Sequence, residues 1–315
     1  MEQLVKEDLK YFNILSLDGG GSKGVYTIGI LKELEQLLGK PLHEHFNLIF
    51  GTSTGSIITA LLGLGYSVDE IEELYLKIIP DIMGKRSKTK RSQSLKKHAQ
   101  RIFNDRTFDE FKTCVGIVTT NSEYKRPMIF KSFEKQAHGR RSSFQKGFGA
   151  TIADAVVASC AAFPYFDKVT IKTLNQGHPL LLDGGFVANN PSLFAIIDAR
   201  NALSIDEKRI RVLSLGTGEF PDKPNRFVGL IQTAIPILPI ELLQTTLSAS
   251  ANTSEQIRKL VFPNVKTLRI NGSFSNPQYA TDLLESDTKK LIKLMGLGRE
   301  SFAKFENDLR VLFSI

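Results

Sequence analysis

Short apolar runs with strand character alternate with longer amphipathic segments over most of this 315-residue chain. The first pair is "FNILSL" (12–17) and "VYTIGILKELEQLL" (25–38), in which apolar residues recur at helical spacing. A second run, "FNLIF" (46–50), leads into the apolar segment "SIITALLGLG" (56–65). Alternation of this kind predicts a mostly parallel central sheet covered by helices on both faces, which is a three-layer α/β/α fold.

The domain organisation follows from the continuity of this pattern. The sequence contains no internal repeat and no Pro/Ser-rich linker long enough to separate domains, so we expect one domain. We place its main α/β part at residues 10–225, with a mobile basic insertion at 80–105. The remainder, 226–315, is expected to be a mostly helical part of the same domain, with two amphipathic helices around "GLG" (296–298).

The net charge of +8 is concentrated in one stretch. Residues 85–101, "KRSKTKRSQSLKKHAQR", contain eight lysine or arginine residues and no acid. Such a run is typical of a solvated surface segment, and it also favours attraction to anionic lipid headgroups or to a phosphorylated ligand. Because no aromatic residue interrupts the run to stack on bases, we expect no DNA or RNA partner.

The N-terminus and the cysteines indicate the compartment. The opening "MEQLVKEDLK" is charged and lacks the apolar core of a secretory signal. The apolar stretch 227–243 is broken by Pro236 and Pro239, and it is shorter than the roughly 20 residues needed to span a bilayer. Cys114 and Cys160 lie in apolar surroundings, which favours buried thiols over a disulfide framework. We expect a cytoplasmic protein whose membrane contact is at most peripheral.

The first glycine-marked turn is "LDGGGSKG", residues 17–24. Gly19, Gly21 and Gly24 formally match a dinucleotide-binding fingerprint, which also requires an acidic residue at the end of the second strand. That strand ends in Phe50 instead. The alternative is that consecutive glycines direct their backbone N–H groups at one point and hold a negatively charged oxygen.

The second turn, "GTSTG" at 51–55, places Ser53 between Gly51 and Gly55. A strand, G-x-S-x-G and a helix in this order form a nucleophile elbow, in which the serine is strained and its neighbours must be small. The alternative is a serine that only caps the following helix. Because the predicted strand and helix both flank the turn, the pattern favours Ser53 as a nucleophile.

An activated serine needs a base, which is most often a histidine supported by a carboxylate. The chain contains five histidines: His43, His45, His98, His138 and His178. None follows the serine at the carboxyl end of a predicted strand, so a histidine triad fits poorly. The third turn, "LLLDGGFVANNPS" (180–192), places Asp183 directly after an apolar strand. An Asx turn is the alternative, but together with the other two turns the pattern predicts Asp183 as the base of a Ser–Asp dyad.

These motifs resemble those of the patatin-like phospholipases: "LSLDGGGSKG", "GTSTG", and "DGGFVANNPSLFAI" followed by "VLSLGTG". The resemblance extends from about residue 12 to 220 and implies a patatin-like catalytic domain. It implies the following site residues: oxyanion donors Gly19, Gly20 and Gly21, nucleophile Ser53 and base Asp183.

Other positions of the same motifs are expected to support the turns: Gly24, Gly51, Gly55, Gly184 and Gly185. Lys23 stands where the family often has arginine, and Ser56 where it often has a second glycine. Neither difference removes a reacting group.

The resemblance implies hydrolysis of phospholipid acyl esters without calcium. The residues agree with this, because no acids are spaced for calcium and no Cys/His set is spaced for zinc. Three alternatives remain: a soluble carboxylesterase or thioesterase, a phospholipase effector of anti-phage defence switched on by a cyclic dinucleotide, and a non-catalytic lipid or partner binder. The basic run and the apolar 227–243 stretch favour a membrane substrate, with peripheral contact at an anionic membrane surface.

Overall fold

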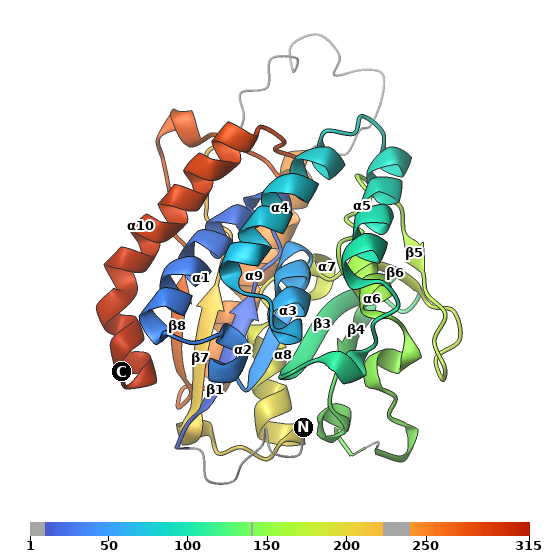
Figure 1. The fold of residues 1–315 in the computed structure, drawn as a ribbon. Coiled ribbons are helices and arrows are strands. Elements are labelled where there is room, and N and C mark those ends of the chain that lie inside the picture. Colours follow the sequence, from blue (N-terminus) through green and yellow to red (C-terminus); the bar gives the residue numbers. More distant parts are fainter. Residues whose placement is uncertain (1–9, 140, 223–239) are drawn as a thin grey trace.

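A computed structural model describes residues 10–139, 141–222 and 240–315. Within this part of the chain an eight-stranded sheet has the order β5-β6-β3-β2-β1-β7-β8, and β4 pairs with β3 (Figure 1). The strands are β1 (Phe12–Leu17), β2 (Leu48–Thr52), β3 (Cys114–Asn121), β4 (Arg126–Lys131), β5 (Val169–Thr170), β6 (Leu180–Asp183), β7 (Ile210–Leu215) and β8 (Lys266–Ile270). Strands β3, β2, β1, β7 and β8 are parallel, whereas β4, β5 and β6 pair antiparallel. The expected α/β fold is confirmed, with a mixed sheet.

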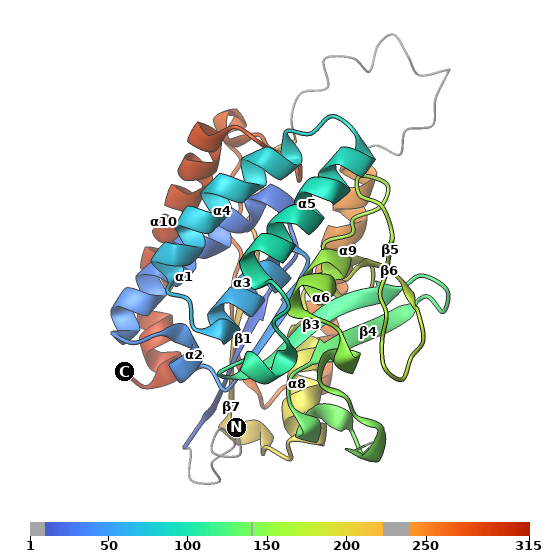
Figure 2. The same cartoon turned by 45° about the vertical axis from the view of Figure 1, so that its right-hand side comes forward.

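Helices cover both faces of the sheet and complete the three layers (Figures 1 and 2). They are α1 (Gly24–Leu38), α2 (Leu42–His45), α3 (Thr54–Leu64), α4 (Val68–Met83), α5 (Lys88–Phe103), α6 (Ile152–Ser159), α7 (Gly185–Ala188), α8 (Ser192–Ile197), α9 (Ile240–Val261) and α10 (Thr288–Phe313). Helices α1, α3, α6 and α10 cover one face, with α4 and α5 packed against them. Helices α7, α8 and α9 cover the other face.

Strand β1 illustrates how the sequence builds two buried faces. Phe12 and Ile14 belong to one hydrophobic core, together with Ala195 of α8. Leu15 and Leu17 belong to the core on the opposite face. Successive side chains of a strand point to opposite faces, so a strand covered on both sides requires an apolar run rather than a polar–apolar alternation.

The basic run differs from the expectation. We expected a mobile insertion at 80–105, but the structure has the regular helix α5 there, with Leu95, Ala99 and Phe103 buried. The helix begins at the cap residue Ser87, whose hydroxyl accepts a hydrogen bond from the N–H of Lys90. The amphipathic pattern is hard to recognise in the sequence because the buried residues recur only at every fourth position among lysines and arginines.

The C-terminal region differs in two further respects. The tail forms one helix, α10, instead of two helices around "GLG". Gly298 allows this helix to lie directly on α1, because a Cβ at this position would be 2.1 Å from the carbonyl oxygen of Tyr26. Strand β8 was not expected. Of the apolar stretch 227–243, residues 227–239 lie outside the described residues, and residues 240–243 belong to α9.

Candidate active site

Ser53 occupies a sharp turn between β2 and α3. Its backbone has φ 52° and ψ −123°, a left-handed conformation that serine adopts only when its surroundings impose it. Gly55 makes the turn possible, because a Cβ there would lie 2.3 Å from the carbonyl oxygen of Leu17. A Cβ at Gly51 would lie equally close, 2.3 Å, to the carbonyl oxygen of Gly55. The Ser53 side chain makes no capping hydrogen bond to α3 in the described structure, so it is not a helix cap.

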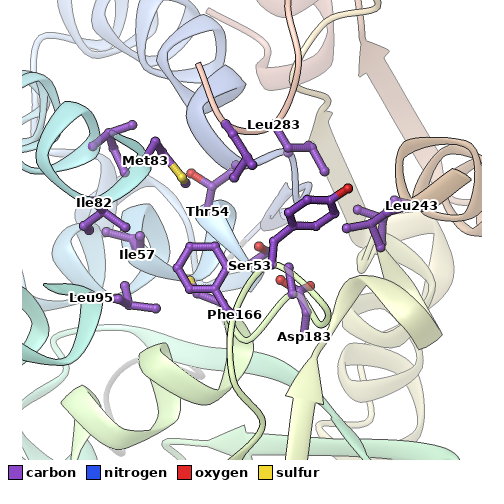
Figure 3. A pocket seen from close by; sticks show the side chains of 18 residues that line it. Ser53, Thr54, Ile57, Ile82, Met83, Leu95, Phe166, Asp183, Leu243 and Leu283 are labelled. Atoms are coloured by element: carbon purple, nitrogen blue, oxygen red, sulfur yellow. The ribbon is translucent and has the colours of Figure 1, made fainter. Parts of the chain in front are cut away.

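Asp183 lies beside this serine. Strand β6 pairs with β3, and β3 pairs with β2, so the end of β6 reaches the level of the Ser53 turn. Figure 3 shows the Ser53 hydroxyl and the Asp183 carboxylate next to each other. The N–H of Gly185 donates to Oδ1 of Asp183 at 2.7 Å. The other carboxylate oxygen, Oδ2, is buried and has no hydrogen-bond partner within the described residues.

Burial determines the acid–base character of this carboxyl group. It raises the pKa of Asp183 to about 7, while the neighbouring Ser53 hydroxyl and Gly185 amide act in the opposite direction. A carboxylate with such a pKa accepts a proton far more readily near neutral pH than an exposed aspartate does. Burial also raises the pKa of the nearby Cys160, so this residue remains an unreactive thiol.

The glycine loop after β1 forms a wall of the same site. Gly20 and Gly21 line the pocket that contains the serine and the aspartate. Gly19 does not line the pocket, and its N–H donates to the carbonyl oxygen of Asn189 at 3.1 Å. Gly21 has φ +57°, and a Cβ there would lie 2.4 Å from the carbonyl oxygen of Leu283. A Cβ at Gly19 would lie 3.1 Å from Cβ of Ser53, so the loop passes close to the serine in a form that larger residues would disrupt.

The remaining motif residues lie around these turns rather than at the serine. Gly24 begins α1, where a Cβ would be 2.4 Å from Oη of Tyr75. Gly184 packs against β3, where a Cβ would be 2.2 Å from the carbonyl oxygen of Val118. Lys23 does not line the pocket of the serine; it lines a separate polar cavity that also contacts the glycine loop.

An ion pair that no sequence motif revealed holds the start of the glycine loop. Asp18 directly precedes the loop and is buried. Arg269 of β8 binds both of its carboxylate oxygens, at 2.8 and 2.5 Å, and also donates to Oγ of Ser214 at 2.9 Å. Only the fold brings Arg269 to this position, because it lies on a strand far along the chain.

We expect Arg269→Met to destabilise the protein by about 3–5 kcal/mol, because it leaves the buried carboxylate of Asp18 without its partner. The double variant Asp18→Asn/Arg269→Met removes that charge as well and should recover a large part of the lost stability. Thermal denaturation of both variants and the wild type measures the difference. A single variant as stable as the wild type would show that the ion pair does not hold the loop.

The pocket above the serine is apolar (Figure 3). It contains about 580 Å³ of empty space, including its opening to solvent. Apolar side chains from segments far apart in the sequence line it: Ile57, Ile79, Ile82, Met83, Leu95, Phe166, Leu243, Leu247, Leu283 and Leu284. No histidine of the described residues lines the pocket. Such a lining suits a hydrocarbon chain held next to a small polar centre.

Residues 10–139, 141–222 and 240–315 contain neither a cluster suited to a metal ion nor a helix suited to span a membrane. No three His, Cys, Asp or Glu side chains in these ranges lie close enough together to bind a metal ion. None of their helices combines the length and the apolar character required to cross a bilayer.

The motifs, the strained serine turn and the fold agree with the comparison to known families. The family model described as patatin-like phospholipase matches residues 15–196. This chain therefore belongs to the patatin-like phospholipase family. Over 298 residues, it is 47% identical to a protein of Escherichia coli named cUMP-AMP-activated phospholipase; the match covers 94% of this chain and 92% of the relative.

Other relatives match about two thirds of this chain. The human calcium-independent phospholipase A2-gamma is 31% identical over 66% of this chain and 28% of its own length. A cGAMP-activated phospholipase of Pseudomonas aeruginosa is 29% identical over 65% of this chain and 62% of its own length. The solved structure of VipD from Legionella pneumophila has the same fold, with a TM-score of 0.52 and 11% identity over 95% of this chain and 67% of that one.

Proposed function

We propose that this protein hydrolyses acyl ester bonds of membrane phospholipids, with Ser53 as the nucleophile and Asp183 as the base. One observation carries the proposal: the strained serine and a buried carboxylate with a free oxygen lie together at an apolar pocket. The pocket accommodates an acyl chain and places its ester carbonyl at the serine. The raised pKa of Asp183 allows the carboxylate to take and return a proton near neutral pH.

The proposed reaction has two stages. Oγ of Ser53 attacks the ester carbonyl carbon while Oδ2 of Asp183 takes the hydroxyl proton. The N–H groups of Gly20 and Gly21 stabilise the oxyanion; we assign no such role to Gly19, because its N–H is bonded to Asn189. The ester C–O bond then breaks, and Asp183 gives the proton to the departing lysolipid oxygen.

In the second stage a water molecule attacks the acyl-serine and gives its proton to Asp183. The acyl–Oγ bond breaks, the proton returns to Ser53, and the fatty acid leaves. This chemistry uses no metal ion, in agreement with the name of the human relative, calcium-independent phospholipase A2-gamma.

The test is release of fatty acid from phospholipid vesicles by the purified protein, measured by mass spectrometry with and without EDTA. We expect fatty acid and lysolipid in equal amounts and no effect of EDTA. A soluble esterase would instead hydrolyse dissolved short-chain esters and leave the vesicles intact. Absence of lipid hydrolysis under all conditions, including the activators below, would overturn the proposal.

A second proposal concerns regulation: we infer that a cyclic dinucleotide activates the enzyme in the cytoplasm, as part of anti-phage defence. It is supported by the 47% identity to the cUMP-AMP-activated phospholipase, which covers nearly all of both chains.

We expect low basal fatty-acid release. One member of a cyclic dinucleotide panel that includes cUMP-AMP and cGAMP should raise the rate roughly tenfold or more. An increase of this size requires only a modest shift in the equilibrium between an inactive and an active conformation. Linear dinucleotides serve as controls. Equal activity with and without every cyclic dinucleotide would remove this proposal but leave the hydrolase assignment in place.

A further inference from the structure

Phe163 is a large apolar side chain exposed at the edge of the active-site pocket. It is 41% exposed, although Ala162, directly before it, and Tyr165, two positions after it, line the pocket. On the α9 side, Leu242 is 47% exposed and directly precedes Leu243, which also lines the pocket. Exposed apolar groups that continue the lining of an apolar pocket are typical of a surface that contacts lipid or another partner.

Two lysines flank the ring of Phe163. The ammonium nitrogen of Lys88 lies 5.5 Å from the ring centre, and that of Lys168 lies 5.4 Å away. Lys88 also pairs with Asp167 at 3.2 Å, and Lys168 donates to Oγ of Ser122 at 3.1 Å. An aromatic ring with cations beside it suits the interface of a bilayer, where the ring enters the headgroup region and the ammonium groups meet the phosphates.

Further positive charge lies at the start of α5, the helix that carries Lys88. Arg86 and Lys90, near the first turn of α5, are exposed, and neither makes an ion pair within the described residues. The exposed face of α5 continues this charge along the helix with Lys97 and Arg101, and the helix itself contains no acidic residue. The exposed charge is therefore not compensated on its own helix.

The basic helix is joined firmly to the pocket wall. Nε of Arg91 donates to the carbonyl oxygen of Tyr165 at 3.0 Å, and the N–H of Asp167 donates to Oγ of Ser92 at 2.8 Å. On the inner side of the same helix, Leu95 lines the pocket. A partner that binds Phe163 and the exposed lysines and arginines of α5 is therefore held at a fixed position relative to the pocket.

We propose that Phe163, Lys88 and Lys168, together with Arg86 and Lys90, form the surface with which the enzyme rests on an anionic phospholipid bilayer. The proposal rests on the proposed function, because it identifies the contact through which the lipid substrate reaches Ser53. Phe163 enters the headgroup region, and the cations bind lipid phosphates. A lipid below this edge then enters the apolar pocket without crossing water.

The test measures binding of Ser53→Ala protein to vesicles by flotation, so that the vesicle lipid stays intact whether or not the proposed chemistry is correct. Vesicles of phosphatidylcholine alone are compared with vesicles that also contain phosphatidylglycerol. We expect preference for the anionic vesicles, weakened by salt. Phe163→Ala should reduce this binding roughly tenfold, and Lys88→Gln/Lys168→Gln should weaken the preference for anionic lipid by roughly tenfold, with the remainder due to Arg86 and Lys90.

Matched controls separate this surface from general effects. Val311→Ala removes an apolar side chain that is 77% exposed on α10, and Lys266→Gln/Lys304→Gln makes the same charge change at exposed positions elsewhere. We expect both controls to bind within about twofold of the parent protein. Equal losses in test and control variants would overturn the proposal, as would absence of vesicle binding. Binding of a DNA oligonucleotide as tight as that of anionic vesicles would assign the surface to polyanions in general and also overturn it.

The same surface variants are also made in protein that retains Ser53. There they should lower hydrolysis of vesicle lipid more than hydrolysis of a dissolved short-chain ester. A parallel loss on both substrates would indicate damage to the active site and contradict the proposed role. Thermal denaturation verifies that each variant is folded.

Discussion

Ser53→Ala is expected to reduce fatty-acid release by roughly a thousandfold or more, because the variant retains the pocket but lacks the oxygen that forms the acyl-enzyme. The pocket and the turn should remain, since alanine differs only in the hydroxyl group and the Ser53 side chain caps no helix. Release of labelled oleate from phosphatidylcholine or phosphatidylglycerol vesicles measures the loss, at the activator concentration that gives full wild-type activity.

Ser56→Ala is the matched control on the same turn. The hydroxyl of Ser56 donates to the carbonyl oxygen of Ser53 at 2.6 Å and so supports the turn without facing the substrate. We expect this variant to lose no more than about tenfold, in line with one lost hydrogen bond. Comparable losses in both variants, or substantial activity of Ser53→Ala, would contradict the assignment of the nucleophile.

Asp183→Asn is expected to cause a loss similar to that of Ser53→Ala, because two residues that act together are not independent in their contributions. In the wild type the reactive form is the ionised carboxylate, so activity should rise with pH as Asp183 ionises near its pKa of about 7. The variant should have no such rise. Rates measured over this pH range with a dissolved ester avoid changes in the vesicle surface.

Ionisation of Asp183 should also make the stability of the protein depend on pH. The pKa of Asp183 is raised from an ordinary 3.8 to about 7 on folding, so the unfolded chain ionises first as pH increases. The wild type therefore loses stability between those two values, by at most about 4 kcal/mol. Because asparagine does not ionise, the variant does not share this loss. The melting temperature of Asp183→Asn minus that of the wild type should therefore increase between pH 5 and pH 8. An unchanged difference over this interval would show that the buried carboxyl does not titrate as inferred.

The sequence predicted the local turns well, because each requires particular residue types. The strained serine needs small residues on either side, and the crowding around Gly51 and Gly55 shows why. The start of α4 is another local pattern, a capping box in which Ser67 and Glu70 each bind the other's backbone N–H. Such patterns depend on atoms within a few residues of each other.

Features that depend on the fold could not be predicted in this way. The carboxyl ends of parallel strands share one edge of a sheet, and this brings together the turns after β1 and β2. Asp183 arrives differently, on the antiparallel strand β6. The pair of Asp18 and Arg269 and the close contact of α10 at Gly298 likewise join segments that no local pattern connects.

The proposed reaction requires Ser53 and Asp183 to act as one pair at the apolar pocket, and covalent labelling tests this most directly. The protein is treated with a fluorophosphonate, and the modified residue is identified by mass spectrometry. We predict one adduct, on Ser53, that forms much more slowly in Asp183→Asn than in the wild type. Labelling of another residue, or an equal rate of Ser53 labelling in the two proteins, would contradict the account.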